Sequence, residues 1–294
     1  MRITVFTPAY NRGYIIEKLF RSLQRQTYTD FEWIVVDDGS TDDTQAKMEA
    51  FQAENHQFPI RYFRVPNGGK HRAINLGVRE ARGELFYIVD SDDYLPDNAL
   101  ALIDKYEKSI PDDQKNTFGG VCGIRSFDTS TPIGTSFEGD TLDITMLERD
   151  AYHITGDKAE VIYTDIMRQF PFPEIEGEKF ITEIAVWYKI AAAGYKLRFF
   201  NEVTMICNYL PDGLTARGKE LFIKNPKGWG LVIALQVEIG RITGFKKWET
   251  YLDYFYLVRG KLSFLEVAHW LKVNPVKLWL RLFGMRVFYK LYSK

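Results

Sequence analysis

The chain has few of the residues on which several classes of fold depend. Among its 294 residues are only two cysteines, Cys122 and Cys207, far apart and outside any CxxC pair, which argues against a thiolate zinc site or a disulfide framework. We expect both to be buried, unpaired thiols, as suits a reducing compartment. The net charge is −1, so composition gives no case for a nucleic-acid partner.

Long apolar runs are also missing. The strongest, WGLVIALQVEIG from Trp229, contains Glu238 and is shorter than the roughly 20 apolar residues of a membrane-spanning helix. The chain opens with Arg2 and the strand-like ITVFTPAY instead of a charged and then apolar leader, so we expect no signal peptide. These absences predict a cytoplasmic protein.

The first hundred residues alternate strand and helix patterns. Short apolar runs predict strands over 3–7, 32–38, 60–65 and 84–90. Helical periodicity lies between them, over 14–26, 42–54 and 70–82, with Ser40 or Thr41 expected as the N-cap of the second helix. Alternation of this kind is typical of an α/β fold with a mostly parallel central sheet and helices on both faces.

The rest of the chain is less regular. We expect a helix from about Asp97, a strand over 117–128, a loop with a short helix over 129–160, a helix over 181–195 and one or two strands over 197–210. Helical periodicity dominates from about 217. The predicted organisation is a catalytic domain over 1–216, with halves at about 1–105 and 106–216, and a helical C-terminal extension over 217–294.

Polar clusters follow each of the first four predicted strands. They are TPAYN, DDGST, NGGKH and DSDD. Ligands of open α/β sheets bind at the carboxyl ends of the strands, so these clusters should meet at one site. Together they offer the groups that bind a nucleotide: the hydroxyl of Thr7, the aromatic ring of Tyr10, the amide of Asn11, the aspartate carboxylates and the ammonium of Lys70.

Three carboxylates in DSDD, those of Asp90, Asp92 and Asp93, repel one another unless a cation joins them. Mg²⁺ and Mn²⁺ prefer carboxylate, water and phosphate oxygens, so a divalent ion beside a diphosphate explains the cluster. The alternative is that these aspartates are loop or helix-capping residues without a ligand. The three other polar clusters favour the cation site.

The motifs TPAYN, VVDDGS and DSDD, in this order and spacing, resemble those of family 2 glycosyltransferases with the GT-A fold. The resemblance covers roughly residues 1–215 and is densest over 3–105. It implies transfer of a sugar from a nucleotide sugar, a UDP-sugar being favoured, with inversion at the anomeric carbon and with Mn²⁺ or Mg²⁺ as cofactor. The implied acceptor is a glycan or a lipid-linked glycan of the cell envelope.

The resemblance assigns roles to single residues. The nucleotide-binding set that we expect is Thr7, Pro8, Tyr10, Asn11, Asp38, Gly69, Lys70 and Asp90. Tyr10 is the candidate to stack on the base and Asp38, more than its neighbour Asp37, to accept from it. Asp92 is the expected direct metal ligand, with Asp90 near the ribose or metal and Asp93 assisting.

Many family members add a histidine to the metal from their closing loop. The matching stretch here, CNYLPDGLTARG over 207–218, has none, so Asp212, Asn208 or water is expected in its place. His71, beside Lys70, is either a contact of the sugar donor or a solvated or capping residue.

Direct displacement needs a base for the acceptor hydroxyl. In the family this base is commonly the second acid of a Glu-Asp pair that opens a helix, with a tryptophan following. Here the pair is Thr182-Glu183, and Trp187 follows at the family's interval, so Glu183 aligns with the base. The alternative is a glutamate that complements the helix dipole. Glu176 and Glu178 are upstream candidates for the same role.

The last stretch, residues 271–294, is basic and apolar without an acid. Such a pattern suits peripheral contact with an anionic membrane, here the inner face of the plasma membrane. It equally suits packing on the catalytic domain or on a second subunit, and a homodimer stays open.

Two other classes of protein compete with a glycosyltransferase. A nucleotidyltransferase also has acidic metal sites, but it usually places a glycine-rich basic loop after the first strand, which TPAYNRG matches poorly. A non-catalytic nucleotide-sugar-binding protein would not need the full carboxylate set. A dinucleotide oxidoreductase is disfavoured because no GxGxxG follows the first strand.

Overall fold

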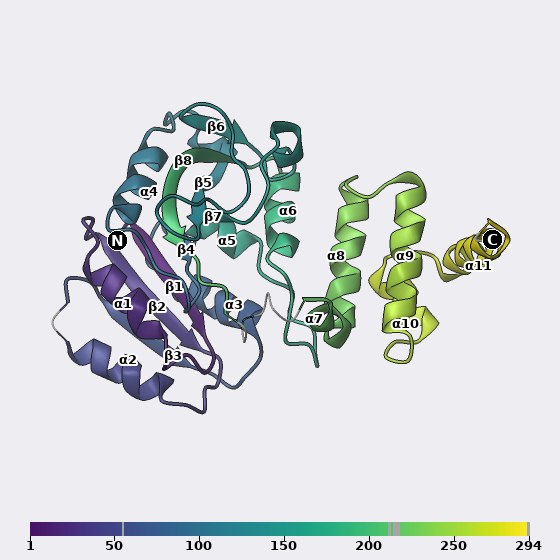
Figure 1. Cartoon of the computed structure of the whole chain (residues 1–294), viewed down its shortest axis with the longest axis horizontal. Coiled ribbons are helices and arrows are strands. Elements are labelled where there is room, and N and C mark those ends of the chain that lie inside the picture. The colour runs from purple at the N-terminus through teal and green to yellow at the C-terminus, as the bar shows by residue number, and fades with distance from the viewer. Residues whose placement is uncertain (55, 211–212, 214–217, 293–294) are drawn as a thin grey trace.

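The computed structural model describes residues 1–54, 56–210, 213 and 218–292, with side chains through 284 (Figure 1). One eight-stranded sheet runs through the larger part of the molecule in the order β3-β2-β1-β4-β7-β5-β8-β6. The strands are β1 Ile3–Ala9, β2 Phe31–Asp37, β3 Ile60–Arg64, β4 Leu85–Ile88, β5 Phe118–Ser126, β6 Thr141–Ile144, β7 Lys158–Tyr163 and β8 Lys196–Ile206. The pairs β1–β2, β1–β4, β2–β3 and β5–β8 are parallel, so the prediction of a mostly parallel α/β sheet is confirmed.

The helices of the first half lie where the periodicity predicts them. They are α1 Ile16–Gln24, α2 Thr44–Ala53, α3 Lys70–Glu80 and α4 Ala99–Lys108. The predicted N-cap of α2 is wrong, because Asp43 occupies that position. Ser40 is instead held in the loop before it, where its backbone N–H donates to Asp37 at 2.7 Å and its hydroxyl accepts from the backbone of Asn11 at 2.8 Å.

One strand and the start of a second lie in the stretch 129–160, which was predicted to be a loop with a short helix, so the loop prediction is wrong there. β7 is inserted between β4 and β5 and runs antiparallel to both, while β6 pairs antiparallel with β8 at the edge of the sheet. β6 has few buried residues and β7 begins with the charged Lys158 and Glu160, so neither has a long apolar run. Pairing with distant strands therefore fixes both.

The helices cover both faces of the sheet and enclose two cores. On one face α1, α2 and α4 bury a cluster that includes Leu19, Trp33 and Ile103. On the other, α3, α5 (Thr164–Gln169) and α6 (Ile184–Ala192) bury a cluster that includes Phe6 and Val186. The sheet is thus a rigid support for residues at its edges.

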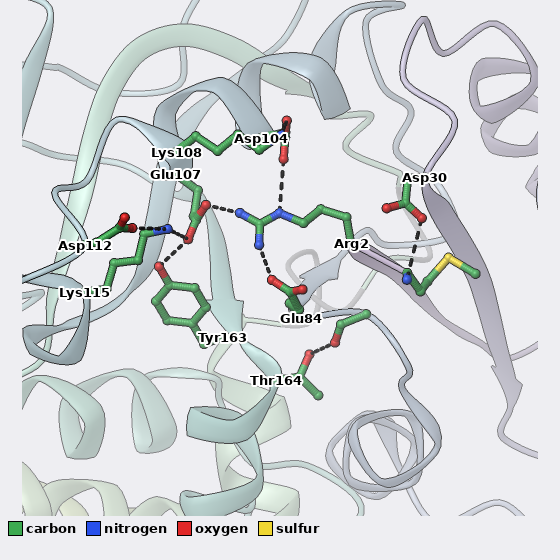
Figure 2. Close-up of polar contacts among 12 residues, drawn as sticks. Arg2, Asp30, Glu84, Asp104, Glu107, Lys108, Asp112, Lys115, Tyr163 and Thr164 are labelled. Atoms are coloured by element: carbon green, nitrogen blue, oxygen red, sulfur yellow. Dashed lines mark hydrogen bonds and ion pairs between the residues drawn. The ribbon is translucent and has the colours of Figure 1, made fainter.

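One edge of the sheet is closed by paired charges (Figure 2). The guanidinium of Arg2, just before β1, donates to carboxylates of Glu84, Asp104 and Glu107. Tyr163, at the end of β7, also donates to Glu107, at 2.6 Å. Because these groups satisfy one another, this end of the sheet contributes to stability. A ligand site is therefore expected at the opposite end, where the parallel strands terminate.

Helices continue from residue 218. They are α7 Gly218–Lys224, α8 Pro226–Glu238, α9 Gly244–Val258, α10 Phe264–Trp270 and α11 Pro275–Tyr292. Val232 of α8 joins the second core, and the buried Glu178 accepts from the backbone N–H groups of Lys227 and Gly228 at 2.5 and 2.6 Å. Figure 1 shows α8 beside the sheet-bearing part and α11 farthest from it.

The tail helices have a core of their own, which includes Tyr251, Tyr254, Val267 and Leu278. Within the described ranges, no helix has both the length and the apolar run needed to cross a bilayer. The domain boundary near 217 remains a prediction.

Candidate active site

The polar clusters of the sequence meet at the end of the sheet where the parallel strands terminate. The carboxyl ends of β1, β2, β4, β5 and β8 lie there, together with the start of the reversed strand β7. A cavity of about 1120 Å³ runs along this edge, and its other wall comes from the start of α6 and from α7. Pro8, Tyr10, Asp38, Gly69, Lys70, Asp90, Asp92, Asp93 and Glu183 all line it.

Asp38 shapes the loop after β3. Its two carboxylate oxygens accept from the backbone N–H groups of Gly68 and Gly69 at 2.7 and 2.8 Å, and Asn67 adds a side-chain donor at 3.0 Å. Burial raises the pKa of Asp38 although these N–H groups oppose the shift. Gly69 has φ +100°, and a Cβ there would come 2.0 Å from the carbonyl oxygen of Lys179, so only glycine permits this approach.

Lys70 joins the two acidic walls of the cavity. Its ammonium lies 2.7 Å from Asp90 Oδ1 and 2.7 Å from Glu183 Oε1. Burial opposes the charged form, but the two carboxylates outweigh it and raise the pKa of Lys70 above its usual range. The pKa of Asp90 is lowered: burial opposes the shift, and Lys70 is the main group that favours it.

Asp92 and Asp93 differ in environment. Burial, with Asp90 nearby, raises the pKa of the half-buried Asp92, and no other residue in the described part of the chain donates a hydrogen bond to its carboxylate. Asp93 is buried and accepts from the backbone of Asn208 at 3.0 Å. Asn208 also donates its amide to the Asp92 carbonyl at 2.8 Å. Asp92 is therefore free to meet a ligand, whereas Asp93 and Asn208 hold the turn.

The donor set fits a divalent ion shared with a diphosphate. No group of three potential protein ligands occurs among the described residues. Mg²⁺ and Mn²⁺ in phosphate sites commonly take one or two carboxylates and complete their shell with water and phosphate oxygens. An Asp92 carboxylate that is desolvated and repelled by Asp90 matches this use, since a cation would relieve both costs.

Glu183 is the residue just before α6 and faces the cavity together with Thr182 and Trp187. The two upstream candidates do not line the cavity. Glu178 caps the start of α8, and Glu176 is exposed. Geometry thus favours Glu183 over both alternatives for contact with a substrate.

Other predicted residues lie beside the cavity and not in its lining. Thr7 is buried and its hydroxyl accepts from Trp33 Nε1 at 3.0 Å. Asn11 holds the β2–α2 loop by accepting from the backbone of Thr41 at 2.8 Å. His71 is buried, and Asp212 lies outside the described residues. Thr7 and Asn11 are placed to support the site from behind.

Several charged residues of the lining were not anticipated. Four of them lie close together in the fold: Arg125, Arg149, Lys158 and Glu160. Arg125, Arg149 and Lys158 lie in or before segments whose strand pairing the sequence did not predict. The start of β7 reaches this end of the sheet only because of the strand order. Recognising KAEVIY as a strand is the one signal that could have found Lys158 and Glu160.

Comparison with known proteins relates part of the chain to one family. Residues 4–114 match the family model described as glycosyl transferase family 2. The GalNAc(5)-diNAcBac-PP-undecaprenol beta-1,3-glucosyltransferase of Campylobacter jejuni is 35% identical over 108 residues, which cover 35% of this chain and 33% of that protein. The match thus spans about a third of the length of the first curated relatives.

Two solved structures have the same fold. Staphylococcus aureus TarS 1–349 in complex with UDP-GlcNAc superposes with a TM-score of 0.59 at 18% identity, covering 97% of this chain and 92% of that one. The mannosyltransferase PcManGT of Pyrobaculum calidifontis, in complex with GDP-Man and Mn²⁺, gives 0.55 at 20% identity, covering 99% and 82%. At these identities the likeness concerns the fold. Residues 4–114 of the chain are therefore similar to family 2 glycosyltransferases, and the chain has the GT-A fold of these two solved structures.

Proposed function

We propose that this chain transfers a sugar, with inversion, from a nucleoside diphosphate sugar to a hydroxyl of a glycan or lipid-linked glycan. The observation that carries the proposal is the facing arrangement of Asp90 and Glu183 across one cavity, with Lys70 2.7 Å from each. A UDP-sugar is favoured, since TarS has been solved with UDP-GlcNAc. A lipid-linked acceptor has a precedent in the Campylobacter relative, whose name specifies undecaprenol.

The nucleotide would lie over the ends of β1 and β2. Tyr10 is 46% exposed in the cavity wall, so its ring is available to stack on a base. Asp38 fixes the 67–69 loop that faces it. The diphosphate would then reach the end of β4, beside Asp92 and Lys70.

Asp92, with Asp90 beside it, would hold Mn²⁺ or Mg²⁺. When bound, such an ion neutralises charge that develops on the departing diphosphate. Lys70 adds a positive charge at the same place, and this charge acts more strongly in a partly buried cavity than in water.

Glu183 would activate the acceptor from the opposite wall. Its carboxylate takes the proton of the acceptor hydroxyl while that oxygen bonds to the anomeric carbon and the bond to the diphosphate oxygen breaks. Attack from the side opposite the leaving group inverts the anomeric configuration. The cavity walls orient both substrates, which can contribute about 7–11 kcal/mol.

A panel of UDP-, GDP- and TDP-sugars with Mn²⁺ tests the proposal. We expect release of the nucleoside diphosphate from one class of donor, and faster release when acceptor is present. A nucleotidyltransferase would release pyrophosphate from a nucleoside triphosphate instead. Donor binding without turnover over a full acceptor panel would favour the non-catalytic alternative, and no donor binding at all would overturn the proposal.

We further infer that the tail contacts an anionic membrane. Val276, Trp279, Leu280 and Phe283 of α11 are 65, 54, 58 and 56% exposed and recur at helical spacing, so they form one apolar stripe. The same helix buries Leu278 and Leu282 in the core of the tail. Packing within the chain therefore accounts for one face of α11 and leaves the stripe uncovered.

Charge separation along the chain supports a membrane over a second protein subunit. Residues 218–294 contain fourteen lysines and arginines against five acids, whereas residues 1–217 contain 24 against 34. A net charge of +9 beside an apolar stripe matches an anionic lipid surface, on which each basic residue contributes about 1 kcal/mol. It disfavours a symmetric contact between two such tails, which would repel.

Flotation with vesicles of phosphatidylglycerol and phosphatidylcholine tests this contact. We expect the full chain to float with anionic vesicles at low salt, and the Trp279→Ser, Phe283→Ser double variant to remain below. Leu265→Ser, which removes a 67% exposed apolar side chain from α10, is the matched control. Flotation that survives the double variant, or that is equal on neutral vesicles, would contradict the inference.

A further inference from the structure

A group of charged residues in the cavity has no role in the reaction described so far. Arg125 lies at the end of β5, Lys158 and Glu160 at the start of β7, and Arg149 in the 3₁₀ turn over 149–152. All four line the cavity. Since the sheet order places β7, β5 and β8 beyond β4, this group and the nucleotide-binding strands β1–β3 lie on opposite sides of Asp90.

Among the residues that the structure describes, the three basic side chains of this group have no carboxylate within ion-pair distance. Within the described part of the chain, the guanidinium of Arg125 makes no hydrogen bond or ion pair, and its buried Nε is unpartnered. Lys158 is only 3% exposed, yet its Nζ donates to two backbone carbonyls, at 2.9 and 2.6 Å. Arg149 donates to a backbone carbonyl, and its Nε is buried without a partner.

Several other cations of the molecule have carboxylate partners. Arg241 lines the same cavity and lies 2.5 Å from Asp150. Lys70 has Asp90 and Glu183, and Arg2 has three carboxylates at the opposite edge. Lys70 and Arg241 thus have carboxylate partners in the cavity, whereas Arg125, Arg149 and Lys158 make no ion pair among the described residues.

Like charges meet in the group. Burial, and then the neighbouring Arg149, lowers the pKa of Lys158. The half-buried Glu160 makes no ion pair among the described residues, and burial raises its pKa although Arg125 and Arg149 oppose the shift. Asp90 and Asp93 act on Arg125 from a distance, and Asp157 acts on Lys158, but none of these carboxylates makes an ion pair with the three cations among the described residues. Buried charge is costly unless a partner compensates it.

We propose that Arg125, Arg149 and Lys158 form a subsite for a carboxylate or phosphate carried by a sugar or polyol substrate, with Glu160 accepting from a neighbouring hydroxyl. The proposal rests on the proposed sugar transfer and names the substrate class. Arginine presents a planar fork that binds either anion in a bidentate manner, and such bonds are stronger than neutral ones. Glu160 repels a bare anion but accepts from a hydroxyl, so the set selects an anionic sugar over a simple salt.

Calorimetric titration of the full chain, with UDP and Mn²⁺ present, tests the subsite directly. The probes are glucuronate, glucose 6-phosphate and glucose. We expect the two anionic sugars to bind at least about tenfold more tightly than glucose, which is the gain in affinity expected for one charged hydrogen bond. Arg125→Gln and Arg149→Gln should remove that preference, and Arg125→Lys should restore part of it.

The matched control is Arg25→Gln, which removes an exposed arginine paired with Asp97 outside the cavity. It should keep the full preference, and UDP binding should persist in every variant as a measure of folding. Equal binding of the three sugars would overturn the proposal, as would a preference that survives both glutamine variants.

The anion can belong to the donor or to the acceptor, and turnover distinguishes the two. Hydrolysis of UDP-glucuronate and UDP-glucose without acceptor reports on the donor, whereas transfer from a neutral donor to phosphorylated, carboxylated and neutral acceptors reports on the acceptor. A preference for the anionic substrate in either arm, lost in Arg149→Gln, supports the subsite. Turnover without any such preference would overturn the subsite and leave the proposed function intact. Anion binding without donor turnover would support the subsite and overturn the proposed function.

Discussion

Replacement of Glu183 by glutamine tests the mechanism most directly. Glutamine keeps the size of the side chain and an oxygen that can accept from Lys70 Nζ, now 2.7 Å from Glu183 Oε1. It removes the site that takes the proton. We therefore expect sugar transfer to slow about 10²- to 10⁴-fold, the usual contribution of a positioned base, which corresponds to about 3–5 kcal/mol of barrier.

A second, smaller effect follows from the lost charge. A hydrogen bond to a charged partner is worth about 1 kcal/mol more than a neutral one, and the Lys70 and Glu183 side chains are 20 and 31% exposed, so solvent reduces the difference. Lys70 keeps Asp90 as its other partner. Donor affinity should therefore change little while turnover falls.

The assay is the transfer rate at saturating donor, together with the donor dissociation constant from calorimetry. Glu176→Gln is the matched control, because Glu176 is exposed and does not line the cavity, and it should turn over at the parent rate. Turnover of Glu183→Gln within about tenfold of the parent would refute the role as base. Donor binding lost in step with turnover would instead assign Glu183 to holding Lys70.

Three further predictions concern the metal, the tail and pH. Asp92→Asn should raise the Mn²⁺ concentration for half-maximal activity by at least about tenfold; an unchanged titration would contradict the assignment. Glu178→Ala removes two charge-assisted hydrogen bonds to α8 and should cost about 3 kcal/mol of stability in denaturant titration, whereas Glu176→Ala should cost nothing measurable. Burial, and then Arg72, lowers the pKa of His71 from 6.5 to about 4. As the pH drops from 6.5 towards 4, the unfolded chain binds a proton that the folded chain does not, so the free energy of unfolding falls by about 3 kcal/mol in total. His71→Leu should flatten this part of the pH profile of thermal melting, and an unchanged slope would show that other groups cause the pH dependence.

The nucleotide-binding half of the fold was predictable because its signals are local. β1, β2 and β4 are buried along almost their whole length, so apolar runs bounded by turn residues marked them to within a few residues. The rule that ligands meet at the carboxyl ends of parallel strands then placed Tyr10 and Asp92 in one cavity.

Side-chain direction and distant pairing escaped the same reasoning. Thr7 was taken as a ligand contact, but it lies within β1 and faces the core, where Trp33 uses its hydroxyl. Glu183 follows Lys70 by more than a hundred residues, and no spacing rule could show that one ammonium joins it to Asp90. The start of β7 reaches the cavity only because β4 and β5 receive it between them.

The division of charge between the two ends of the molecule makes it a long electric dipole. The sheet-bearing residues carry −10 and the tail +9, and Figure 1 places α11 far from β1–β3. In the field of an anionic surface such a body rotates before it touches, with the tail leading and the sheet held away. The orientation of the cavity relative to that surface would then be fixed during approach, and added salt would randomise it before it weakened the apolar contact.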